Sequence, residues 1–92
     1  MTLDIRHQLA DRRFETEVEG LLCVLDYTLA HGVMTITHTL VPEAVGGRGI
    51  AASLVKTALE HARREHWKVV PACSYAEAWM RRHPEYDDLR LG

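Results

Sequence analysis

The stretch VPEAVGGRGIAASLV, residues 41–55, decides the fold of this chain. An alternating, β-branched pattern ends at Val41, and an amphipathic helix begins near Gly49. Between them, Gly46 and Gly47 form a turn whose backbone amides are not covered by side chains. Such amides, together with the positive end of the helix dipole, bind anions, most often phosphate. The stretch therefore predicts a strand, an anion-binding turn and a helix in direct succession.

Three strand patterns precede the glycine turn. Residues 13–19 alternate apolar and charged side chains, which is the period of a strand with one face in water. Two further runs are apolar or β-branched, and the tight turns Glu19-Gly20 and His31-Gly32 join all three into an antiparallel meander. The expected strands cover residues 13–19, 21–29 and 33–41, with a short edge strand within residues 4–9.

Helical patterns follow the turn. Ile50, Leu54, Ala58 and Ala62 share one apolar stripe over about four helical turns. The short apolar run 68–71 then predicts another strand. Because a strand, a helix and a strand follow one another, we expect a right-handed parallel crossover.

A second helix is expected from Ser74, because the S-x-x-E pattern of Ser74 and Glu77 is a capping box. Tyr75 and Trp79 follow at helical spacing and are expected to be buried anchors. Pro84 ends the helix, since the residue before a proline avoids the helical conformation.

The predicted fold class is α/β (α+β), a single compact domain over residues 1–92. It has a mostly antiparallel sheet, one parallel β-α-β crossover and two main helices. The net charge of −2 shows no basic excess, so nucleic acid is not expected as a partner. The sequence contains no apolar run of roughly 18 residues, so we expect no membrane span, and the polar N-terminus favours the cytoplasm. Cys23 and Cys73 form no C-x-x-C pair, which argues against a disulfide framework and a zinc site.

Two nucleotide-binding interpretations of the glycine turn fail. A Walker loop needs Gly-Lys-Ser/Thr, whereas this chain has Gly49-Ile50-Ala51. A dinucleotide pattern G-x-G-x-x-A does occur from Gly47, but the preceding strand ends six residues earlier. No acidic residue ends the next strand, at Val70, to hold a ribose.

The turn instead resembles the acyl-CoA loop of the GNAT-type N-acetyltransferases, whose motif is Gln/Arg-x-x-Gly-x-Gly/Ala. Here the motif falls on residues 46–51, with Gly46 in place of the usual Gln or Arg. The chain is also similar to a very small GNAT-like family of about this length. Three segments carry that similarity: His38–Pro42 (HTLVP), Val69–Cys73 (VVPAC) and Arg81–Tyr86 (RRHPEY). Ser74 stands where that family often has proline.

The resemblance implies one minimal GNAT-like domain that binds acetyl-CoA and transfers acetyl to an unidentified amine or protein acceptor. The alternative is a non-catalytic acyl-CoA sensor or interaction module. It also implies that the strand before the loop splays from its parallel neighbour to admit the pantetheine arm of CoA. A monomer or weak dimer is expected. The expected cofactor-binding residues are Leu40, Val41, Gly46, Gly47, Arg48, Gly49, Ile50, Ala51, Cys73, Ser74, Arg81 and His83.

Cys73 and His38 are the candidate catalytic residues. Cys73 lies at a helix N-terminus, a position that stabilises a thiolate, so it either carries the acyl group or lines the pantetheine slot. His38 alternates with Met34, Ile36 and Leu40 and is expected to share their face, which is either the core or the CoA gap. It serves either as a base for the amine or as a hydrogen-bonded structural histidine. Glu43 is a weaker base candidate. Full-size GNAT enzymes build the acceptor site from helices after the first strand. This chain lacks them, so an open acceptor surface is expected.

Overall fold

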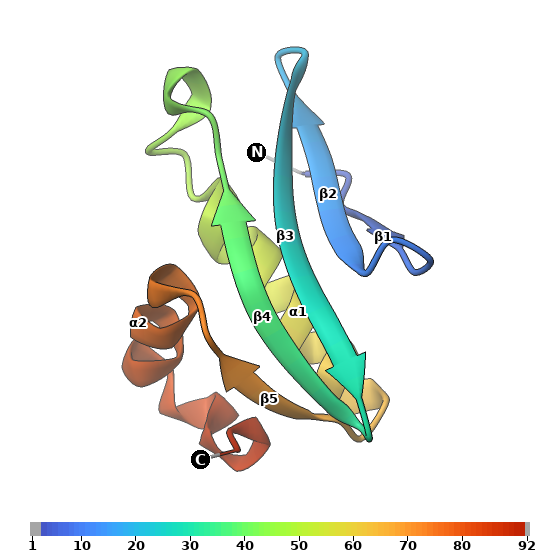
Figure 1. Cartoon of the computed structure of the whole chain (residues 1–92). Coiled ribbons are helices and arrows are strands. Elements are labelled where there is room, and N and C mark those ends of the chain that lie inside the picture. The colour runs from blue at the N-terminus through green and yellow to red at the C-terminus, as the bar shows by residue number, and fades with distance from the viewer. Residues whose placement is uncertain (1–2, 92) are drawn as a thin grey trace.

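The computed structural model describes residues 3–91 and has the predicted architecture (Figure 1). One sheet runs in the order β1-β2-β3-β4-β5, antiparallel from β1 to β4 and parallel between β4 and β5. The mostly antiparallel sheet, its parallel crossover and the two main helices are thus confirmed. The elements are β1 (Arg6–Gln8), β2 (Arg13–Val18), β3 (Leu21–Ala30), β4 (Val33–Leu40), η1 (Glu43–Val45), α1 (Ile50–Arg64), β5 (Lys68–Pro71), α2 (Ser74–Arg82) and η2 (Pro84–Leu89).

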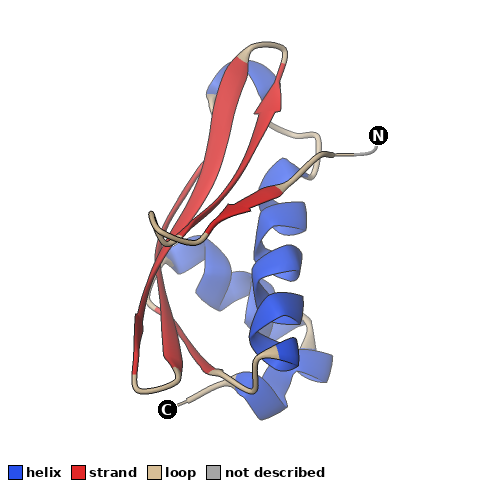
Figure 2. Cartoon of the chain, turned by 90° about the vertical axis from the view of Figure 1, so that its right-hand side faces the viewer, coloured by secondary structure: helices blue, strands red, loops and turns tan. Residues whose placement is uncertain are grey.

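The core lies between one face of the sheet and the helix α1 (Figure 2). The apolar stripe of α1 packs on strand residues such as Phe14 and Leu25, which are at most 2% exposed. Burial of this stripe, rather than helix propensity, stabilises α1. The second face, called here the outer face, is open around Leu22 and Leu40, which are 43% and 52% exposed.

A bulge in β4 changes which residues reach the core. His38 pairs with Asp26, but the next residue of β3, Tyr27, pairs with Ile36, so Thr37 is an extra residue in β4. Beyond the bulge, Thr39 lies opposite buried Leu25 and faces the core, because directly opposed residues share a face.

The expected common face of His38 with Met34 and Ile36 is therefore wrong. Met34 and Ile36 are fully buried, whereas His38 and Leu40 lie on the outer face and are exposed. The prediction assumed that alternate residues share a face along the whole strand. One inserted residue moves every later side chain to the opposite face of the sheet.

Two predictions about α2 also need correction. The N-cap is Cys73, whose Sγ accepts the amide proton of Ala76 at 3.4 Å, so Ser74 is already the first helical residue. Tyr75 is not a core anchor, since it is 39% exposed, whereas Trp79 is buried as expected.

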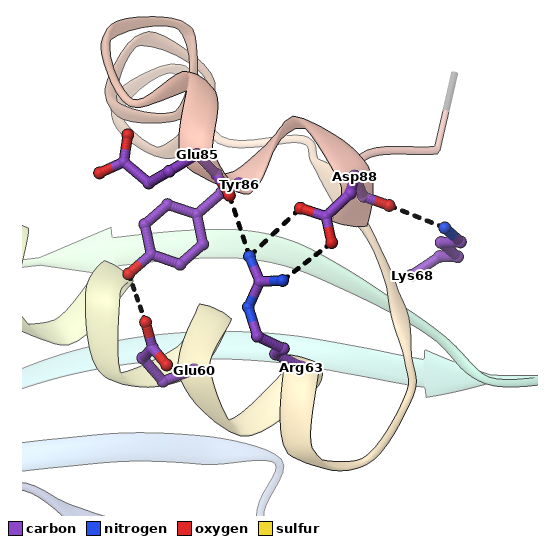
Figure 3. Close-up of polar contacts among 6 residues, drawn as sticks. All are labelled: Glu60, Arg63, Lys68, Glu85, Tyr86 and Asp88. Atoms are coloured by element: carbon purple, nitrogen blue, oxygen red, sulfur yellow. Dashed lines mark hydrogen bonds and ion pairs between the residues drawn. The ribbon is translucent and has the colours of Figure 1, made fainter.

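Side-chain contacts attach the C-terminal segment to α1 and to the start of β5 (Figure 3). Arg63 donates to both carboxylate oxygens of Asp88, at 2.8 and 3.2 Å, and Lys68 Nζ donates to the Asp88 carbonyl at 2.7 Å. The Tyr86 hydroxyl donates to Glu60, and burial followed by this bond raises the pKa of Tyr86 to about 12. These contacts hold η2 beside α1 at the end remote from the glycine turn.

Both edges of the sheet are short or covered. β1 has only three residues. At the other edge, Val69 of β5 forms a parallel bridge with Arg90, and the amide of Leu91 donates to the Val69 carbonyl at 2.9 Å.

Candidate functional site

The glycine turn links β4 to α1 through a fixed backbone path. The amides of Val45 and Gly46 donate to the carbonyls of Pro42 and Glu43, both at 3.0 Å, which closes η1. Val45 is fully buried and anchors this short helix in the core. Gly47 then has a φ of 76°, in the left-handed region that glycine adopts without strain.

The amides after η1 have no protein partner in the described part of the chain. The first backbone bond of α1 runs from Ser53 to the carbonyl of Gly49, the N-cap, whose φ is 77°. Within residues 3–91, the amides from Gly47 to Ala51 donate to no other protein group. A Cβ at Gly46 would lie 3.3 Å from the carbonyl oxygen of Glu43, whereas the space beside Gly47 and Gly49 is open. Free amides at a helix N-terminus, with no side chain on Gly47 or Gly49 beside them, fit a phosphate group.

β4 and β5 separate close to this turn. Their pairing ends at Ile36 and Pro71, and the Ile36 carbonyl then accepts the amides of both Ala72 and Cys73 at 3.0 Å. Figure 1 shows β5 diverging from β4 and turning into α2. β4 continues to Leu40, so within residues 3–91 its last four residues have no parallel neighbour. This is the splay that the resemblance implied.

Cys73 lies inside that splay. Its Sγ is 3.4 Å from Thr39 Oγ1 on β4, and the residue is half-buried against the core. Sequence reasoning missed Thr39, although it belongs to the HTLVP segment, because only the bulge turns it toward Cys73. The thiol thus caps α2 and faces the unpaired end of β4 at the same time.

Arg48 does not point freely from the turn. Its guanidinium donates to the carboxylate of Glu19, at the tip of the β2–β3 turn. This pair joins the glycine turn to a hairpin 29 residues away, and no local sequence signal reveals it.

Arg81 and His83 are engaged at the C-terminal end of α2. Arg81 pairs with Glu77 at 2.7 Å, and His83 Nδ1 donates to the Trp79 carbonyl at 2.7 Å while its ring stacks on Trp79. These contacts give both residues a structural role. Their contact with CoA stays a prediction.

The base candidates are placed differently from one another. His38 lies on the outer face opposite Asp26, and Glu43 is exposed in η1. Over the described residues 3–91, neither side chain forms a hydrogen bond or ion pair. In the same range, no group of three or more His, Cys, Asp or Glu residues is placed to hold a metal ion. None of the helices there is long and apolar enough to cross a membrane.

Two other features lie away from the turn. A hollow of about 400 Å³ beside Arg63 and Trp67 is at the far end of α1, roughly 20 Å along the helix by its rise per residue. A histidine cluster lies under β1, where His7 Nε2 is 2.6 Å from the Tyr27 hydroxyl and the ring of His61 lies 4.5 Å from that of His7. Burial lowers the pKa of both histidines, and the nearby His61 lowers that of His7 further.

A splayed mixed sheet with a glycine turn at the start of α1 defines a class of acyltransferase-like domains. The chain belongs to the GCN5-related N-acetyltransferase (GNAT) family, whose model matches residues 13–89. Protein NATD1 of Gallus gallus is 31% identical over 85 residues, which are 89% of this chain and 77% of the relative. Protein NATD1 of Mus musculus is 31% identical over 83 residues, 87% of this chain and 76% of the relative. A GCN5-like protein from Staphylococcus aureus, solved in solution by NMR, superposes with a TM-score of 0.79 at 28% identity, covering 98% of this chain and 89% of that one.

Proposed function

We propose that this chain, as one domain, binds acetyl-CoA and transfers its acetyl group to an amine. The observation that supports this best is the row of free amides from Gly47 to Ala51, next to the place where β4 loses β5. A diphosphate needs such donors, and an extended arm needs such an unpaired strand edge. The family membership of residues 13–89 supports the same ligand.

Each part of the ligand has a matching part of the chain. When bound, acetyl-CoA supplies an acetyl group activated as a thioester. The amides at the start of α1 would bind the diphosphate, and the unpaired end of β4 would hold the pantetheine arm by main-chain hydrogen bonds. A backbone amide near Leu40 or Val41 would donate to the thioester carbonyl oxygen and stabilise negative charge there. Two free thiols are consistent with a reducing cytoplasm, where we place the protein.

The outer face is the proposed acceptor surface. Leu22 and Leu40 are 43% and 52% exposed on it, so this face offers an open apolar surface to an acceptor. We therefore propose a protein terminus or a lysine side chain as the acceptor, since a protein can bind an open face through a broad contact surface. His38 lies on this face and would take the proton that the amine loses.

A route through Cys73 is the alternative to direct attack by the amine. The Cys73 sulfur would form a bond to the acetyl carbon as the bond from that carbon to the CoA sulfur breaks. The thiol proton would pass to the departing CoA sulfur, and the amine would then displace the thiol. The position of Cys73 Sγ beside Thr39, within the splay, supports this route.

A non-catalytic acyl-CoA sensor is the second candidate. It is favoured by one observation, namely that His38 has no hydrogen-bond partner among residues 3–91 to orient its ring. A base that is free to rotate is poorly placed for proton transfer.

Three measurements test these proposals. Calorimetry with acetyl-CoA reports binding, and intact mass after incubation reports a gain of one acetyl group on Cys73, with Cys73→Ser as the control. Steady release of CoA in the presence of a lysine peptide supports the enzyme, and His38→Gln should then slow release without weakening binding. Binding without release supports the sensor. The absence of both heat and mass change would contradict both candidates.

A further inference from the structure

The glycine turn has a single cation, and that cation is already paired. Arg48 is the only basic residue between Val41 and Val55. Its partner Glu19 has a φ of 52° and, with Gly20, forms the tip of the β2–β3 hairpin. Figure 1 places this tip at the same end of the sheet as η1. A turn built to bind an anion therefore has a carboxylate beside it.

The pair is exposed enough to exchange partners. The Arg48 side chain is 34% exposed and the Glu19 side chain 62%. Exposed ion pairs hold weakly, because water solvates both charges and salt screens them. A guanidinium binds a carboxylate and a phosphate with the same donors, so one partner can replace the other.

We propose that Glu19 is a latch that keeps Arg48 from the anion site until a diphosphate displaces the carboxylate. The latch rests on the proposed function, that is, on acetyl-CoA binding at the glycine turn. A diphosphate carries more charge than one carboxylate and can therefore displace Glu19 from Arg48. Glu19 thus lowers the affinity for CoA.

The test compares Glu19→Gln with a matched control. Glu17→Gln removes the same charge two residues earlier, at an exposed position with no ion pair among residues 3–91. At low ionic strength, Glu19→Gln should bind CoA about two- to fivefold more tightly than the wild type, the range expected for an exposed pair. Glu17→Gln should match the wild type, and the affinity for pantetheine, which has no diphosphate, should not change.

A double-mutant cycle separates the latch from simple charge repulsion. In the Arg48→Gln background, Glu19→Gln should no longer tighten CoA binding. An equal gain in both backgrounds would show general repulsion and overturn the latch. Weaker binding by Glu19→Gln would show that Glu19 instead positions Arg48 for the ligand, which also overturns it.

The CoA affinities of the wild type and of Glu19→Gln test the latch and the proposed function separately. If the wild type binds CoA and Glu19→Gln binds it equally well, the latch is wrong and the proposed function stands. If neither protein binds CoA, the proposed function is wrong and the latch falls with it.

Discussion

Replacing Gly49 by alanine tests the glycine turn against a control within the same chain. Gly49 and Gly32 have φ values of 77° and 75°, and a Cβ at either position meets no atom within 4 Å. The cost is therefore purely conformational, about 1–2 kcal/mol for a left-handed alanine, and the reduced entropy of the unfolded chain offsets a part of it. We expect both variants to lose about 1 kcal/mol of unfolding free energy, or roughly 4–8 °C in Tm for a domain of this size.

Only Gly49→Ala should weaken the binding of CoA. The methyl group of Gly49→Ala stands among the free amides at the start of α1, whereas Gly32 lies in the β3–β4 turn. Loss of one hydrogen bond to a charged phosphate corresponds to about tenfold weaker CoA binding. Urea denaturation measures the stabilities and calorimetry the affinities. A stability difference above about 0.5 kcal/mol would refute the conformational argument. Equal CoA affinities of the two variants would refute the assignment of the glycine turn as the diphosphate site.

Three further predictions concern the histidine cluster, the Tyr86 hydroxyl and the cap of α2. Burial lowers the folded-state pKa of His7 and His61 below their ordinary 6.5, so the unfolded chain binds protons first. Stability should thus be complete above that value and fall as the pH drops through it. Urea midpoints at about pH 7.5 and about pH 5.5 measure this, and equal midpoints would contradict it. Tyr86→Phe removes the donor to Glu60 and should cost about 1 kcal/mol by urea denaturation, so an unchanged midpoint would argue against that bond. Cys73→Ala should lose the α2 cap and about 1 kcal/mol, while Cys73→Ser keeps it, and equally unstable variants would exclude the cap.

The features of the fold that depend on residues close together in the chain are predicted well from the sequence. The turns at Gly20 and Gly32 and the start of α1 after Gly49 follow from local backbone preferences, and all three are present. The parallel crossover to β5 follows from element order and the handedness of such connections.

Side-chain direction and long-range pairing were not predictable in the same way. The extra residue Thr37 leaves no signature in composition, yet it moves His38 to the outer face and Thr39 toward Cys73. The S-x-x-E pattern predicts Ser74 as the N-cap of α2, but Cys73 occupies that extended position and Ser74 is already helical. Arg48 meets Glu19 only because two separate turns end at the same place in the fold.

The short β1 and the covered edge of β5 limit how this protein can assemble. A three-residue strand offers few free backbone groups to a neighbouring strand, and Arg90 and Leu91 already occupy the far side of Val69. Growth of the sheet by adding a strand from another copy is therefore disfavoured at both ends. Two copies that stack through the outer face, where Leu22 and Leu40 are exposed, would cover the proposed acceptor surface. In a dimer of that kind, self-association and reaction with an acceptor would exclude each other.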